Sequence, residues 1–465
     1  MSPVMRLGRV GILALFLMLF TFVGYAADPA GAGAAASPPS PATPAASIPL
    51  LDKPALGYAN SELPSWLTLS GEFRYRFESR HGLGYTEGND DGYNLLRTRL
   101  DIGIRAAPWL QFFVQGQDSR APGIREGARN NGVFRDPLDL RQAYVKIGAT
   151  ENSPISVTVG RQLLSYGAQR LIGPLDWTNT SRAFDAAKVE IKPLDNVKLD
   201  FFSASVVQND PTRRVDLSPE GNNLHGFYGA VEKVLPKSTI EPYVLWKTSP
   251  FVTGEGLRGD LDRYTAGFRV WSANVQGWDY DVSFNRQWGS FGSGDISAWA
   301  YYLTLGHKFN IATKPRAFVE YNFASGDDDP ADGKIGWFDD LYSTAHLWYG
   351  YNDLVGWRNI KNLRLGLQLD PLPKLRLHVD FHSFWLADGN DHLYSAPGAI
   401  SVRAPAGGAA DTKVGDELDL TFAVPVTATT TVGAGVGHMF PGPFLKANSP
   451  GGSDTFVYMF VGYKF

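Results

Sequence analysis

The stretch LRTRLDIGIRA, Leu96–Ala106, alternates strictly between charged and apolar side chains. The charged side chains share one parity: Arg97, Arg99, Asp101 and Arg105. The apolar side chains share the other: Leu96, Leu100, Ile102 and Ile104. Because successive side chains of a β-strand point to opposite faces, the stretch predicts a strand with one apolar face and one strongly charged face.

The same alternation recurs from about Trp66 to Phe465, and no helical period of comparable length competes with it. About eighteen such segments can be counted, and they begin near Leu67, Tyr93, Trp109, Asp139, Pro154, Asp185, Asn196, Leu224, Ile240, Arg263, Gly277, Ile296, Pro315, Asn359, Lys374, Gly415, Thr429 and Ser453. After the N-terminal segment the chain has no apolar run of the ~18 residues that a spanning helix needs, so it would cross a membrane as strands.

The connections between these segments alternate between short and long. Tight turns are expected at residues 107–108, 193–195, 236–238, 370–373 and 426–428. Long connections are expected at residues 119–138, 164–184, 208–223, 249–262, 325–358, 388–414 and 441–452. Short periplasmic turns and long extracellular loops are typical of outer-membrane barrels. The sequence therefore predicts an all-β fold, a transmembrane antiparallel β-barrel of about 18 strands in the bacterial outer membrane.

The N-terminus has the pattern of an export signal. Arg6 and Arg9 precede the apolar run Val10–Val23, and Gly24–Ala26 supplies a small-residue cleavage pattern. We expect a signal peptide at residues 1–26; a single membrane anchor is the alternative. Residues 27–65 are rich in Ala, Pro and Ser and predict a disordered periplasmic linker, and residues 66–465 form the barrel domain.

The last strand is alternately apolar and aromatic. Its side chains of one parity are Val457, Met459, Val461, Tyr463 and Phe465. A terminal aromatic strand of this kind resembles the signal by which bacterial outer-membrane proteins are recognised by their assembly machinery. We therefore expect that machinery and outer-membrane lipid as partners.

Composition excludes several other classes of protein. Basic and acidic side chains nearly balance, with a formal charge of -4, so no affinity for nucleic acid is expected. Cysteine is absent, which excludes disulfides and thiolate metal sites. The sequence contains no recognisable catalytic or phosphate-binding motif, so we expect neither an enzyme nor a cofactor.

If the apolar parity faces lipid, the charged parity lines a lumen wide enough for water. The arginines predicted to face the lumen are Arg74, Arg76, Arg97, Arg99, Arg105, Arg269, Arg364 and Arg376. Asp101 is predicted to face the lumen as well. The concentration of these arginines on the first two strands would attract an anion, because guanidinium groups bind carboxylates in bidentate fashion. The alternative is a ladder of ion pairs that stiffens the wall, and both can hold at once.

Several segments resemble conserved stretches of the bacterial alginate export family: Leu140–Gly148 (LRQAYVKIG), Val159–Asn179 (VGRQLLSYGAQRLIGPLDWTN), His378–Asp391 (HVDFHSFWLADGND) and Asp416–Leu420 (DELDL). The resemblance implies an 18-stranded outer-membrane barrel with an arginine-rich conduit for an anionic exopolysaccharide. It also implies pore-lining roles for Arg141 and Arg161, and approximately for Arg105. Arg161 shares the lipid-facing parity of Val157 and Val159, so a bulge or a strand end must intervene.

One loop carries clustered acidic side chains: Asp327, Asp328, Asp329 and Asp332. Hard oxygen ligands of this kind bind Ca²⁺ in other proteins, but the spacing does not match an EF-hand. No metal site is therefore predicted, and this loop is kept only as a weak calcium candidate against the alternative of a solvated acidic loop.

Together these features predict an outer-membrane channel that passes a polar, anionic polysaccharide or a small saccharide through an arginine-lined pore. Periplasmic secretion components would be further partners. The alternatives are a general or nutrient-selective porin and, from another class, an outer-membrane hydrolase.

Overall fold

The computed structural model describes residue 60 and residues 62–128, 131–148, 153–254, 257–329, 331–372 and 374–465. The expected signal peptide lies outside these residues, as does nearly all of the expected linker. Within the described part of the chain, no helix is long and apolar enough to cross a membrane.

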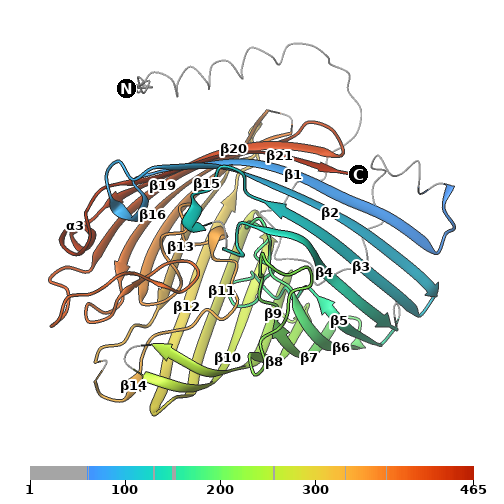
Figure 1. Cartoon of the computed structure of the whole chain (residues 1–465), viewed down its shortest axis with the longest axis horizontal. Coiled ribbons are helices and arrows are strands. Elements are labelled where there is room, and N and C mark those ends of the chain that lie inside the picture. The colour runs from blue at the N-terminus through green and yellow to red at the C-terminus, as the bar shows by residue number, and fades with distance from the viewer. Residues whose placement is uncertain are drawn as a thin grey trace. The chain divides into compact units, whose positions relative to one another are not determined.

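Eighteen antiparallel strands form a closed barrel, and each wall strand pairs with its neighbour along the chain. The strands are β1 (Leu67–His81), β2 (Asp91–Ala107), β3 (Leu110–Arg120), β4 (Asp136–Ile147), β5 (Ile155–Gln162), β6 (Phe184–Leu194), β7 (Val197–Val206), β8 (Asn223–Glu232), β9 (Ser238–Gly254), β10 (Leu257–Val275), β11 (Trp278–Phe291), β12 (Gly294–Lys308), β13 (Arg316–Ala324), β15 (Ile360–Leu372), β16 (Leu375–Leu386), β19 (Lys413–Pro425), β20 (Thr430–Pro441) and β21 (Asp454–Lys464). Because β21 pairs with β1, the sheet has no free edge (Figure 1). The predicted fold class and strand number are confirmed.

The exposed side chains follow the predicted alternation on β2. Leu100 and Ile102 are 56% and 42% exposed, whereas Arg97 and Arg99 are 2% and 5% exposed. An apolar side chain that is exposed on a closed barrel faces lipid, because the other face of the wall is inside. The apolar parity therefore forms the lipid-facing surface, and the charged parity faces the interior.

Long and short connections alternate along most of the chain, but two outer connections, β9–β10 and β11–β12, are short. The loops after β13, β16 and β20 contain short elements of their own: β14 (Lys334–Ile335), η3 (Ala345–Leu347), β17 (Leu393–Tyr394), β18 (Ile400–Val402) and α3 (Pro443–Asn448). The long loop expected at residues 249–262 is wrong, because β9 continues to Gly254 and β10 begins at Leu257. The alternation of this hairpin is weaker than elsewhere, and backbone pairing extends the strands beyond it.

Two long loops occupy the interior of the barrel, namely the β5–β6 loop (residues 163–183) and the β13–β15 loop (residues 325–359). They meet at a bridge between Ile172 and Tyr342. Their apolar side chains form one buried cluster with side chains of the wall, including Phe202, Leu224 and Tyr243. The apolar core of this protein therefore lies inside the barrel, where it fixes both loops.

Candidate functional site

The β5–β6 loop lies against the inner face of β1 to β4. Gln117 on β3 donates from Nε2 to the Thr180 carbonyl at 2.8 Å, and the Ser119 hydroxyl donates to the Asn179 carbonyl at 2.9 Å. Asn179 donates in turn to the Leu96 carbonyl at 3.1 Å. Side chains of the inward parity thus hold the loop by its backbone.

Five inward arginines converge on this loop, and we call them the arginine cluster: Arg74, Arg76, Arg97, Arg99 and Arg141. Arg99 and Arg97 approach the Asp176 carboxylate at 2.9 and 3.3 Å, and Arg141 approaches it at 3.6 Å. Arg74 and Arg76 donate to loop carbonyls instead, Arg74 to Thr178 at 2.8 Å and Arg76 to Trp177 at 2.6 Å.

Positive charge is in excess at the arginine cluster. Its ion-pair partners are Asp176 from the loop and two carboxylates from β1, Glu72 and Glu78. Five guanidinium groups therefore meet three carboxylates, which leaves two positive charges in excess. Such an excess attracts anions, and guanidinium groups recognise carboxylates by paired hydrogen bonds.

The Asp176 carboxylate is open to water, although the arginines around it are not. Half of its side chain is exposed, compared with 2% for Arg97 and 5% for Arg99. The surrounding protein would raise the pKa of Asp176 by desolvation, but the charges of Arg99, Arg97 and Arg141 outweigh this effect and hold the pKa well below its usual range. Asp176 is therefore an ionised carboxylate that is bound by arginines and is accessible to water.

Trp177 anchors the loop beside this carboxylate. The Arg76 guanidinium lies 4.0 Å from the centre of its ring, and the His346 ring of the β13–β15 loop stacks on it at 3.9 Å. Tyr458 on β21 contacts it edge-on at 4.9 Å. The two interior loops and the wall are thus joined at one aromatic side chain.

The same loop makes a second charged contact with the wall through Arg170. Its Nη2 lies 2.8 Å from Oε1 of Glu320 on β13, and its Nη1 donates to Asn322 at 2.8 Å. Its guanidinium also lies over the rings of Tyr302 and Trp348, at 3.9 and 4.0 Å. Only 4% of Arg170 is exposed, so this contact is closed to water.

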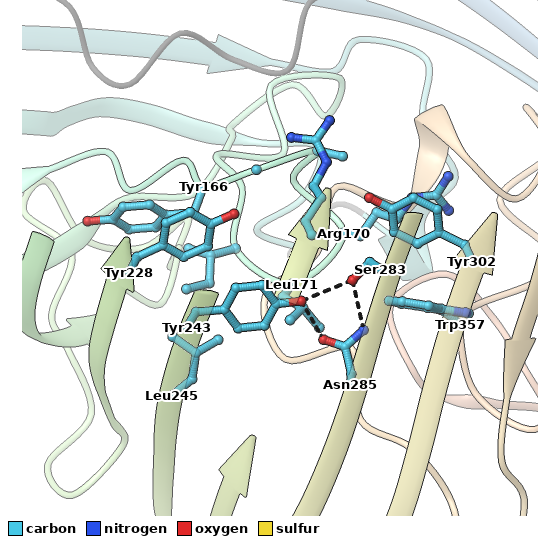
Figure 2. Close-up of a pocket in the computed structure, with 14 residues that line it drawn as sticks. Tyr166, Arg170, Leu171, Tyr228, Tyr243, Leu245, Ser283, Asn285, Tyr302 and Trp357 are labelled. Atoms are coloured by element: carbon cyan, nitrogen blue, oxygen red, sulfur yellow. Dashed lines mark hydrogen bonds between the residues drawn. The ribbon is translucent and has the colours of Figure 1, made fainter. Parts of the chain in front are cut away.

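Figure 2 shows a small cavity beside Arg170, with tyrosines on one side and Tyr302 on the other. Tyr228 stacks on Tyr166 with a centroid distance of 4.8 Å and on Tyr243 at 5.2 Å. The free space is about 20 Å³, which is enough for about one water molecule. This cavity is too small for a sugar ring and belongs to the packing of the loop.

Other predicted pore residues form ion pairs within the wall. Arg269 pairs with Glu241 at 3.0 Å and with Asp281 at 2.7 Å. Arg364 pairs with Asp380 at 3.0 Å. These arginines are engaged by neighbouring strands, as the alternative of an ion-pair ladder predicts.

Three predicted residues lie apart from the loop contacts. Arg105 and Arg376 are exposed near the ends of β2 and β16 that face the short turns. Asp101 accepts hydrogen bonds from Gln115 at 2.6 Å and from Ser70 at 3.2 Å. It is therefore held by neutral side chains of the wall.

Arg161 departs from the alternation at the end of β5. Gly160 has a φ of +122°, and a Cβ there would lie 2.3 Å from the Ala143 carbonyl oxygen, so glycine is needed. Arg161 and Gln162 are both buried, and Arg161 binds Asp185 of β6 through two hydrogen bonds of 2.8 and 3.0 Å. The strand end that the parity argument required is at this position, and Arg161 is not in the arginine cluster.

The acidic loop binds its own backbone. The two Asp327 carboxylate oxygens accept the N–H groups of Asp329 and Gly336 at 3.2 and 3.1 Å, and Asp332 pairs with Lys334 at 3.0 Å. Asp327, Asp328, Asp329 and Asp332 therefore stay only the weak calcium candidate that the sequence offers.

Sequence reasoning missed the loop residues that contact the barrel wall. Asp176, Trp177 and Arg170 all lie in the family-like stretch that ends at Asn179, so a signal was present. Alternation assigns faces only to strands, however, and gives no indication that a loop folds inward.

A closed barrel with a lipid-facing apolar surface and a charged interior defines an outer-membrane channel. A family model described as "Alginate export" matches residues 65–458, which is nearly the whole barrel. The chain therefore belongs to the alginate export family. The resemblance of its sequence motifs to that family is confirmed. Proteins of this family are channels, not enzymes.

Solved structures of similar fold include three barrels from Pseudomonas aeruginosa. OpdQ is 12% identical, with a TM-score of 0.59 over 87% of this chain and 99% of that chain. OccK11 (OpdR) is 12% identical, with a TM-score of 0.57 over 86% and 96%. OccK2 (OpdF) is 10% identical, with a TM-score of 0.56 over 86% and 98%. No curated protein sequence matches this chain.

Proposed function

We propose that this channel passes a polar, anionic saccharide, and that the arginine cluster guides its carboxylates. The observation that carries the proposal is the binding of Asp176. Three guanidinium groups already hold a carboxylate there, at distances of 2.9, 3.3 and 3.6 Å, and half of that carboxylate is open to water. A carboxylate on a sugar chain would meet the same donors.

The mechanism is diffusion along a charged wall. Arginine stays protonated at any physiological pH and offers several N–H donors in a planar array, so a carboxylate can pass from one guanidinium to the next without a proton transfer. The two excess positive charges lower the energy of an anion at this position, and Asp176 competes with it for the same donors.

Two further facts support a sugar acid as the substrate class. The family to which the chain belongs is described as alginate export. One barrel of similar fold, OccK2, was crystallised in complex with glucuronate, which is also a sugar carboxylate. Recognition by the assembly machinery through Phe465, and cooperation with periplasmic secretion components, belong to the same proposal.

Ion selectivity in planar lipid bilayers tests the role of the cluster. We expect the wild-type channel to prefer anions and the double variant Arg97→Ala/Arg99→Ala to lose most of that preference. Arg403→Ala removes one positive charge from an exposed loop and serves as the control. Cation preference in the wild type, or selectivity that is unchanged in the double variant, would refute the arginine-guided pathway and favour a general porin.

Block by polymers tests the substrate class. Polygalacturonate, a polymer of sugar carboxylates, should interrupt the single-channel current at concentrations at which neutral dextran of equal length does not. Equal block by both polymers would show that size alone decides entry.

A further inference from the structure

A second group of charged side chains, none of which belongs to the arginine cluster, lies near the outer ends of the strands. Asp136 and Asp139 are on β4 just after the long β3–β4 loop, and Asp216 is in the β7–β8 loop (residues 207–222). One carboxylate oxygen from each residue lies within 4.8 Å of the others. All three are buried, with exposed fractions of 1%, 7% and 0%.

Neighbouring groups do not neutralise these three carboxylates. Within the described residues their one ion pair joins Arg161 to Asp139, at the 4.0 Å limit of such a contact. Arg161 is already bound to Asp185 through two hydrogen bonds, so its charge is largely used. A buried carboxylate that lacks a counter-charge is costly, and three together are more so.

Two carboxylate oxygens of the group also lack a hydrogen-bond donor. Asp136 Oδ1 and Asp216 Oδ2 are buried, and no N–H or hydroxyl group of the described residues donates to them. The two carboxyl groups contact each other instead, so a proton or a cation must lie between them. The remaining donors of the site are backbone N–H groups: Asp216 donates to Asp139 Oδ1 at 3.1 Å, and Asp210 donates to Asp216 Oδ1 at 3.0 Å.

We propose that Asp136, Asp139 and Asp216 form a binding site for one Ca²⁺ ion. Hard oxygen ligands are those that Ca²⁺ prefers, and water can complete its shell of six to eight ligands. Ligands on opposite sides of Ca²⁺ lie up to about 5 Å apart, so three carboxylate oxygens that all lie within 4.8 Å of one another can bind one such ion.

The ion would join the start of β4 to the β7–β8 loop, and a side chain of that loop contacts two further loops. Asp216 brings the β7–β8 loop to β4, and Asn209 of that loop donates to the Ser181 carbonyl at 2.9 Å and to the Gly132 carbonyl at 3.3 Å. Ser181 in turn accepts a hydrogen bond from Arg99 at 2.7 Å. Calcium would therefore stabilise the end of the loop that contacts the arginine cluster.

Binding to the full chain in detergent tests the site directly. After treatment with EGTA, equilibrium dialysis against ⁴⁵Ca²⁺ should show one ion per chain. Asp216→Asn should weaken its affinity at least about 10-fold, because even a group next to a metal ligand contributes that much. Glu126→Gln removes an equal charge from the neighbouring β3–β4 loop and should bind like the wild type. A wild type that binds no Ca²⁺ overturns the proposal and indicates carboxyl groups that are protonated instead.

Ca²⁺ binding by Asp216→Asn with the affinity of the wild type also overturns the proposal. The variant Asp332→Asn would then show whether the ion binds the acidic loop instead. Thermal unfolding gives a second readout that does not require bound ions to be counted. In EGTA, Asp136→Asn should unfold at a higher temperature than the wild type, because repulsion among the buried carboxylates falls. In Ca²⁺ the order should reverse, and a variant that is less stable under both conditions contradicts the site.

Discussion

The β5–β6 loop meets the barrel wall twice, with opposite charge. At Arg170 the loop supplies the cation and β13 supplies Glu320, with 3% and 1% of the two side chains exposed. At Asp176 the loop supplies the anion and the wall supplies arginines, and half of the carboxylate is open to water. An ion pair that is closed to water fixes position, whereas one that borders water can exchange partners with a solute.

The two contacts therefore have different expected roles. The Arg170 contact is surrounded by aromatic rings and holds the loop inside the barrel. The Asp176 contact places a water-exposed carboxylate over the buried arginine cluster, where a solute can compete with it. Variants at each contact separate stability from selectivity.

The largest effect is expected at Arg170. Arg170→Ala leaves the Glu320 carboxylate buried without its cation, which costs about 3–5 kcal/mol of folding stability. The midpoint of the heat-induced transition in detergent should fall, and single-channel currents should become noisier as the loop loosens. Pairing the change with Glu320→Gln should restore part of the lost stability. If the single variant is as stable as the wild type, the contact does not hold the loop.

Asp176→Asn is expected to act mainly on selectivity. It raises the excess at the arginine cluster from two to three positive charges, and about 0.5–1 kcal/mol of added attraction would raise the anion-to-cation permeability ratio by a factor of roughly two to five. Stability should fall by at most about 1 kcal/mol, because half of the side chain is in water. Reversal potentials in a salt gradient measure the ratio, and a fall in anion preference would contradict the proposed competition.

The pH dependence follows from the same carboxylate. The pKa of Asp176 is well below its usual range in the folded protein, so its contribution to stability is fully present above the unfolded value of about 4. That contribution is lost only as the pH falls through the lower folded pKa. The difference in selectivity between wild type and Asp176→Asn should therefore stay constant from pH 8 to about pH 4 and diminish only as the pH falls through the lower folded pKa. A change near pH 6 would assign the effect to another group.

The smallest effect is expected at Arg105. Its side chain is exposed, and within the described residues no carboxylate forms an ion pair with it. Arg105→Ala should change stability by less than about 0.5 kcal/mol and should lower anion selectivity less than Arg97→Ala/Arg99→Ala does. An equal loss in both variants would place the selective region near the short turns instead of at the loop.

Much of the fold could be predicted from the sequence, because a barrel strand is specified by local alternation. The number of strands and the inward parity of Arg97 and Arg99 follow from a period of two, which needs no knowledge of distant residues. At residues 249–262 the sequence predicts a long loop, whereas the structure has a strand hairpin. Backbone pairing extends the two strands here, although their side chains do not alternate.

The site could be predicted only in part. The sequence indicates that arginines gather on the inner face of β1 and β2, but not that Asp176 is bound among them. Arg97 and Asp176 are 79 residues apart, and their contact depends on the folding of a loop into the barrel. The group of Asp136, Asp139 and Asp216 likewise joins the start of β4 to the β7–β8 loop.

The sequence by itself determined which side of each strand faces lipid and which faces the interior, since that choice follows from hydrophobicity at alternate positions. Only the tertiary structure decided what fills the interior and which charges remain open to water. The reason is that loop positions are fixed by long-range packing and ion pairs, which leave no periodic pattern in the chain.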